Sequence, residues 1–185
     1  MQNSIKLSNN TTILKYQNWE LSQNREKIAD FIYERFTERY IFPLTTGRKN
    51  RFIMMGAASL LIETYESFRN GYENTRPAGF GEKCFKDFFN REANFSVLTG
   101  RGRDFYQNVR CGILHQGETK DGWKINRGES SQLFESATKS INANVFLKNM
   151  ERVIANYRDE LKITDWNDPL WKHFRDKMDF VILNC

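Results

Sequence analysis

The sequence predicts an all-α protein, a single bundle of about five or six helices that allows one short β-hairpin. Apolar residues recur at three- and four-residue spacing over several long stretches, which is the period of an amphipathic helix. Asn, Ser, Gly and Pro stand at the ends of these stretches as start and stop signals. The chain has no long linker, internal repeat or low-complexity run, so we expect residues 1–185 to form one domain.

The N-terminal third is expected to hold two long helices after a polar start. A β-prone patch at Thr11–Tyr16 predicts a short strand or arm. The first helix spans about Ser22–Tyr40, with the Ser22 hydroxyl as its N-cap. The second spans about Lys49–Asn70 and ends at Gly71, which suits a left-handed C-cap. Its expected core face consists of Ile53, Ala57, Leu60, Leu61, Tyr65 and Phe68.

The rest of the chain is expected to contain four helices and one strand. A shorter helix around Phe85–Phe89 contributes its phenylalanines to the core, and a helix over Thr99–Gly117 follows it. Trp123–Ile125, between two glycines, predicts a short strand or hairpin arm. The last two helices span about Asn142–Leu161 and Pro169–Leu183, and the second has proline at its first position.

Composition restricts the classes of partner and location. There are 28 basic and 23 acidic residues, a net charge of +5, which is compatible with a polyanionic partner but does not require one. Three cysteines at no metal-ligand spacing indicate reduced thiols. The N-terminus lacks the pattern of a signal peptide, and no apolar stretch approaches the ~20 residues that span a bilayer. We therefore expect a cytoplasmic protein without a membrane segment.

Sequence motifs for the common enzyme classes are missing. No HxxxH, HExxH or Cys/His cluster indicates a transition-metal site, and no Walker loop, GxGxxG or GxSxG motif is present. We therefore expect no metal and no cofactor. The chain has two histidines. His173 lies among charged neighbours in the last helix and is expected to be an ordinary surface or boundary residue, which leaves His115.

Residues 104–123 hold the one concentrated chemical signal, Arg110 and His115 near the end of a predicted helix. Five residues rotate by about 140° around an α-helix, so the two side chains do not share a face of a straight helix. In a purely structural interpretation, Arg110 is an ordinary mid-helix cation, and His115 interacts with the helix dipole and the free carbonyls of the last turn. Spacing alone does not decide between structure and chemistry.

The stretch N-V-R-C-G-I-L-H-Q resembles the R-x(4–6)-H signature of the HEPN superfamily, in which the motif lies on a late helix of a small helical bundle. The longer stretch FYQNVRCGILHQGETKDGWKI resembles uncharacterised bacterial HEPN-like proteins. The resemblance implies a metal-independent endoribonuclease that acts on RNA as a homodimer, with the two motifs meeting across a twofold axis. It further implies use as a toxin, with a neutralising antitoxin protein as partner, or in defence against phage.

Carried over to this chain, the resemblance makes Arg110 the residue that holds the scissile phosphate and stabilises the developing charge. His115 would move protons at the 2′-hydroxyl or the leaving oxygen, leaving 2′,3′-cyclic phosphate and 5′-hydroxyl ends. Active family members often place Asn, Asp or His directly after the arginine, whereas this chain has Cys111, either a small buried packing residue or a redox-sensitive thiol. This departure favours a second hypothesis, a non-catalytic HEPN-like module that binds RNA, a nucleotide or a protein.

Further candidates for substrate contact surround the motif. Asn108 and Gln116 either hydrogen-bond the substrate or are surface amides, and Tyr106 either stacks on a base or packs. Glu63 and Glu66, on the second helix, are expected to be exposed carboxylates, with an ion pair to Arg110 as the alternative for either. A cationic rim for a phosphate backbone, or simply a solvated run of charge, comprises Arg101, Arg103, Lys120, Lys124 and Arg127.

Overall fold

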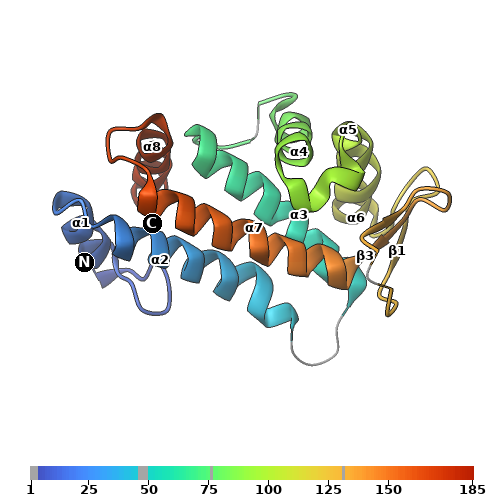
Figure 1. Ribbon diagram of the computed structural model, residues 1–185, viewed down its shortest axis with the longest axis horizontal. Helices are drawn as coiled ribbons and strands as arrows, with labels where there is room; N and C mark the ends of the chain where they lie inside the picture. Colours follow the sequence, from blue (N-terminus) through green and yellow to red (C-terminus); the bar gives the residue numbers. More distant parts are fainter. Residues whose placement is uncertain (1–3, 46–49, 76, 131) are drawn as a thin grey trace.

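The computed structural model describes residues 4–45, 50–75, 77–130 and 132–185 and is mostly helical with one small sheet (Figure 1). The predicted fold class is confirmed. The α-helices are α1 (Ile13–Leu21), α2 (Arg25–Phe36), α3 (Arg51–Asn70), α4 (Phe80–Arg91), α5 (Gly102–Phe105), α6 (Cys111–Gln116), α7 (Ala143–Ile163) and α8 (Pro169–Leu183). The π and 3-10 turns are η2 (Thr37–Ile41), η3 (Phe42–Leu44), η4 (Ala93–Leu98) and η5 (Tyr106–Arg110). The strands are β1 (Lys124–Asn126), β2 (Phe134–Glu135) and β3 (Ser140–Asn142).

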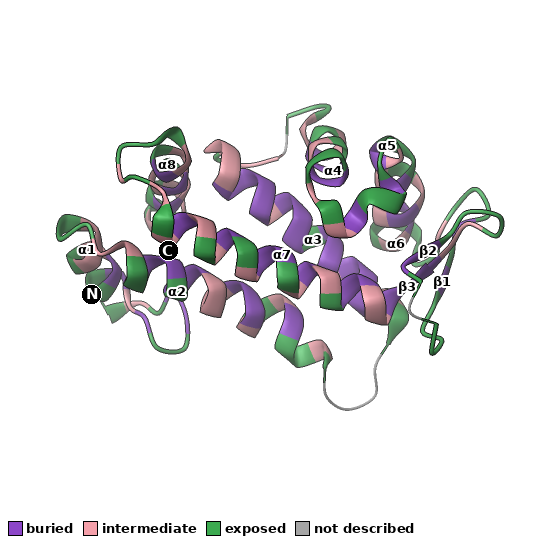
Figure 2. Cartoon of the chain, viewed as in Figure 1, coloured by how far each residue is buried: buried purple, intermediate pink, exposed green. Residues whose placement is uncertain are grey.

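Helices α2, α7 and α3 run along the length of the molecule. Helices α8, α4 and the α5–α6 segment cross them, so this view shows these helices nearly end-on (Figure 1). Helix α3 packs against α7, α8 and α4, and it is buried along much of its length (Figure 2). The sheet lies beside the start of α7, with strand order β1-β3-β2. β1 pairs parallel with β3, and β2 pairs antiparallel with it. The predicted strand is therefore part of a three-stranded sheet.

Aromatic side chains fill the core where α4, η4, α5 and α7 meet. Phe95 and Phe146 have ring centroids 4.8 Å apart, and Phe105 stacks on Phe146 at 5.6 Å. Full burial of a side chain of this size stabilises the fold by roughly 1.5–3 kcal/mol. The expected core phenylalanines of α4 are confirmed as buried, namely Phe85, Phe88 and Phe89.

The N-terminal prediction was wrong in two respects. The β-prone patch begins helix α1, because the Thr12 side chain accepts the Lys15 N–H as an N-cap and Tyr16 is buried in the core. Ser22 caps the C-terminus of α1, and the N-cap of α2 is Asn24. Helix α2 ends at Phe36, and the π turn η2 continues the helical segment past the predicted end at Tyr40.

The second helix is where it was predicted, and its predicted core face is confirmed in part. Its predicted start at Lys49 lies outside the described residues, and α3 begins at Arg51 and has Gly71 as its C-cap in the left-handed conformation, φ 69°. Leu61, Tyr65 and Phe68 are buried as predicted, whereas Ile53 and Leu60, also expected in the core, are 59% and 42% exposed. Met54, Met55, Ala58 and Ile62 complete the buried apolar face.

The C-terminal helices agree with the prediction. Asn142 caps α7 through its side chain, and α8 runs from Pro169 to Leu183 with Asp168 as its N-cap. In the ranges that the structure describes, no helix is both long enough and apolar enough to cross a membrane.

The close approach of α5 to α4 depends on Gly102, and this yields a first prediction. A Cβ added at Gly102 would lie 2.5 Å from the Lys86 backbone, so Gly102→Ala should lower the free energy of unfolding by about 1–3 kcal/mol. At Gly56, a matched control within α3, the added Cβ would lie 3.7 Å from Ile113, an ordinary contact. Gly56→Ala should be neutral or stabilise by up to about 1 kcal/mol. Urea unfolding measures both, and equal effects would contradict the close packing.

Candidate functional site around Arg110

The expected helix over 99–117 is divided into α5, the π turn η5 and α6. In η5 the Cys111 N–H donates to the Tyr106 carbonyl, five residues back. The Asn108 carbonyl accepts the Lys120 N–H at 2.9 Å, so the loop after α6 folds back onto the π turn. Gly112 allows this approach, since a Cβ there would lie 2.5 Å from the Glu118 carbonyl oxygen. Single π turns inside helices are frequent at functional sites.

Arg110, at the end of η5, is paired with Glu63 of α3. Arg110 Nε donates to Glu63 Oε1 at 2.6 Å, and Thr75 Oγ1 donates to Glu63 Oε2 at 2.9 Å. The expectation that Glu63 and Glu66 are exposed was wrong, because they are 7% and 0% exposed. The alternative, an ion pair with Arg110, holds for Glu63 alone. Sequence reasoning missed Thr75, a loop residue with no pattern that marks it.

The ion pair fixes the charge and the direction of Arg110. Burial favours a lower pKa for the guanidinium, but the hydrogen bond and the charge of Glu63 outweigh it and raise the pKa of Arg110. The side chain is 18% exposed and lies over the Tyr106 ring, 5.4 Å from its centroid. In the described part of the chain, neither Nη atom of Arg110 donates a hydrogen bond. The guanidinium is thus held by one edge.

Tyr106 and Cys111 are packed together behind the arginine. The Tyr106 ring lies against Gly81, where an added Cβ would be 2.8 Å from the ring. The centroids of the Tyr106 and Phe85 rings are 5.6 Å apart. Burial, together with the neighbouring Cys111 thiol, raises the pKa of the Tyr106 hydroxyl. These contacts support packing for Tyr106. Cys111 is half-buried and is a free cysteine.

His115 lies in the last turn of α6, which Gly117 ends in the left-handed conformation, φ 71°. The imidazole is exposed, and no hydrogen bond or ion pair to it occurs within the described ranges. Five residues of an α-helix rotate by about 140°, so Arg110 and His115, at the two ends of the α6 segment, are directed to different faces.

The remaining candidates are dispersed around this segment. Asn108 is half-buried, whereas Gln116 is exposed and donates to the Glu118 carbonyl at 3.3 Å. Arg103 is exposed, and its Nε lies 3.8 Å from Glu82 Oε2. Arg101 Nη2 donates a hydrogen bond to Ser136 Oγ at 3.0 Å. The exposed members of the predicted rim are Arg103, Lys120, Lys124 and Arg127.

His173 is a boundary residue, as expected. Its ring is half-buried, and Nδ1 lies 2.9 Å from the Arg69 carbonyl oxygen. Among the residues that the structure describes, no group of three or more His, Cys, Asp and Glu side chains is arranged to hold a metal ion.

Comparisons with known proteins add no family assignment. No protein-family model, curated protein or solved structure matches the chain.

The burial of the Arg110–Glu63 pair yields a second prediction. Arg110→Ala leaves the Glu63 carboxylate buried without its cation, so it should lower the free energy of unfolding by about 3 kcal/mol. Glu63→Ala should cost a similar amount, and the double variant should lose clearly less than the sum of the two. Urea unfolding of the four proteins measures the coupling. Additive losses would mean that the pair does not fix the site.

Proposed function

We propose that this chain is a metal-independent endoribonuclease of the HEPN type that acts as a homodimer. The observation that carries the proposal is the anchoring of Arg110 at Nε by the buried Glu63, which leaves the Nη edge for a ligand. A guanidinium held in this way is suited to a phosphate, because its donors are oriented before the substrate binds. Its placement next to a π turn fits the same role.

His115 provides the proton-transfer group of the proposed reaction. Imidazole can both accept and donate a proton near neutral pH, and this ring is exposed and unengaged within the described ranges. It would take the proton of the 2′-hydroxyl or deliver one to the 5′-oxygen, so that the chain breaks to a cyclic phosphate and a 5′-hydroxyl. Arg110 would stabilise the negative charge on the phosphate oxygens during this step.

The dimer is part of the proposal because one chain separates the two side chains. In a twofold arrangement, Arg110 of one copy meets His115 of the other, and each site is shared. The helices that carry Glu63 and His115 also expose apolar side chains, namely Ile53, Leu60 and Leu114, at 59%, 42% and 43%. Burial of these side chains against a second copy would favour association. Exposed cations nearby, such as Lys120, would attract the RNA backbone.

A second candidate function is a non-catalytic module that binds RNA, a nucleotide or a protein. The observation that favours it is Cys111, a half-buried free cysteine that follows Arg110 directly. A polar side chain is therefore missing next to the arginine. The use of the protein as a toxin, the identity of an antitoxin and a role in phage defence depend on the same proposal.

A third prediction concerns cleavage. Purified protein in excess EDTA should cleave RNA and leave 2′,3′-cyclic phosphate ends, and His115→Ala should lower the rate by about 100-fold or more, since it removes proton transfer. His173→Ala, the same substitution at the chain's other histidine on α8, is the matched control and should keep most of the rate. No cleavage by the folded wild type would reject the ribonuclease and favour the binding module, and cleavage at the full rate by His115→Ala would reject His115 as the proton-transfer residue.

A fourth prediction tests the shared site. Arg110→Ala and His115→Ala proteins, each inactive, are mixed, allowed to exchange subunits and assayed. Half of the dimers should be mixed, and each of these should have one intact site, so about a quarter of the wild-type activity should return. If the mixture stays inactive after exchange, although differently tagged chains show that mixed dimers have formed, Arg110 and His115 do not act across the interface.

A further inference from the structure

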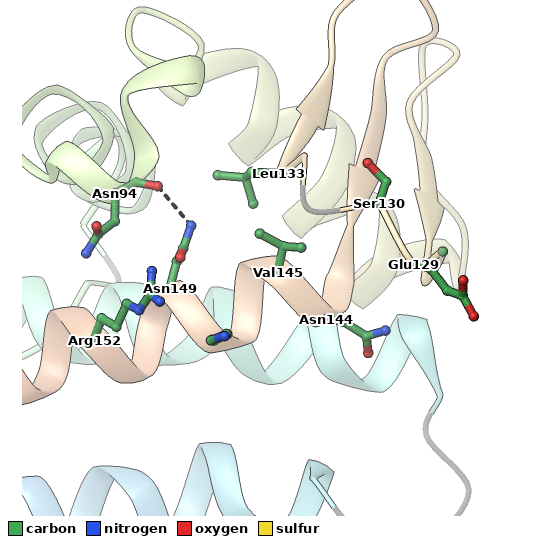
Figure 3. Close-up of a pocket in the computed structure, with 10 residues that line it drawn as sticks. Asn94, Glu129, Ser130, Leu133, Asn144, Val145, Asn149 and Arg152 are labelled. Carbon is green, nitrogen blue, oxygen red and sulfur yellow. Dashed lines mark hydrogen bonds between the residues drawn. The ribbon is translucent and has the colours of Figure 1, made fainter.

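A polar cleft of about 610 Å³ lies away from Arg110, between α7 and the segments before it (Figure 3). None of its lining residues belongs to η5 or α6. Its volume falls within the roughly 300–1,000 Å³ of typical small-molecule sites. The lining residues on which the argument depends are Asn94, Leu133, Val145, Lys148, Asn149 and Arg152.

Two cations of α7 give the cleft its charge. Lys148 and Arg152 are one helical turn apart, and both are exposed. Neither forms an ion pair with a carboxylate in the described part of the chain. Glu129 is the one acidic residue of the lining, and its side chain points away from Arg152, on the opposite side of the cleft (Figure 3). The cations are therefore not neutralised locally, and they suit an anionic group.

Amides and apolar groups line the cleft beside these cations. Asn149 Nδ2 donates to the Asn94 carbonyl at 3.0 Å, which holds Asn149 next to Arg152 (Figure 3). Asn144, also in the lining, donates to the Arg127 carbonyl at 3.2 Å. Leu133 and Val145 lie near each other and give the cleft an apolar wall (Figure 3).

We propose that this cleft binds a nucleoside phosphate, either free or as a unit of an RNA strand. Lys148 and Arg152 hold the phosphate, because paired cations offer several donors to its oxygens. The amides hydrogen-bond the edge of the base, while Leu133 and Val145 pack against its face. The site shares no residue with the one around Arg110, so it does not depend on the proposed ribonuclease activity.

The test is isothermal titration calorimetry of the full chain in EDTA at fixed ionic strength, with AMP, ATP, inorganic phosphate and a short single-stranded RNA as separate probes. The protein carries His115→Ala, so that RNA is not cleaved, and the variants at Lys148 and Arg152 separate binding in this cleft from binding at Arg110. We expect AMP or ATP to bind, or RNA alone if the unit belongs to a strand. Lys148→Glu with Arg152→Glu should weaken binding by about tenfold or more, through charge reversal at the phosphate.

Lys27→Glu, compared with Lys148→Glu alone, is the charge-matched control, because Lys27 is an exposed helical lysine of α2 with no ion pair in the described ranges. It should leave affinity unchanged. Equal weakening in Lys27→Glu would indicate general attraction to a basic protein and overturn the site. Binding of inorganic phosphate as tightly as AMP would overturn the role of the amides and the apolar wall, and no binding of any probe would overturn the proposal. Circular dichroism checks that each variant is folded.

Discussion

Two buried carboxylates of α3 constrain the rest of the structure. Glu63 and Glu66 lie one turn apart, and each is paired with an arginine of a later segment, Arg110 of η5 and Arg91 of α4. Burial raises the pKa of Glu66, and Arg91 opposes this through its hydrogen bonds and its charge. A buried carboxylate is tolerated only where a cation meets it in good geometry. These two pairs therefore fix how the later segments lie against α3.

The same pairs explain the form of the candidate site. Glu63 binds Nε of Arg110, with Thr75 on its other oxygen, so the guanidinium is oriented by residues inside the protein. His115 has no such support and lies on an exposed last turn. In the proposed enzyme, the arginine is fixed by its own chain, and a second copy would bring its partner histidine to it.

The parts of the candidate site that are local in the sequence could be predicted, whereas contacts between distant segments could not. Arg110 and His115 could be selected from the sequence because histidine is scarce and the motif is local. The sequence could not show which of Glu63 and Glu66 pairs with Arg110. Both glutamates lie on one helix, and the choice depends on where η5 packs. The cleft on α7 was missed for a similar reason, because Lys148 and Arg152 have the spacing of an ordinary solvated helix face.

The sequence by itself determined the features that depend on a single turn or a single helical period. The left-handed ends at Gly71 and Gly117 and the limits of α8 are of this kind. Only the tertiary structure decided that Thr11–Tyr16 begins a helix, that α3 exposes Ile53 and Leu60, and that a π turn precedes α6. Burial and ion pairing join residues far apart in the chain. Their free energy exceeds the small preferences that local sequence expresses.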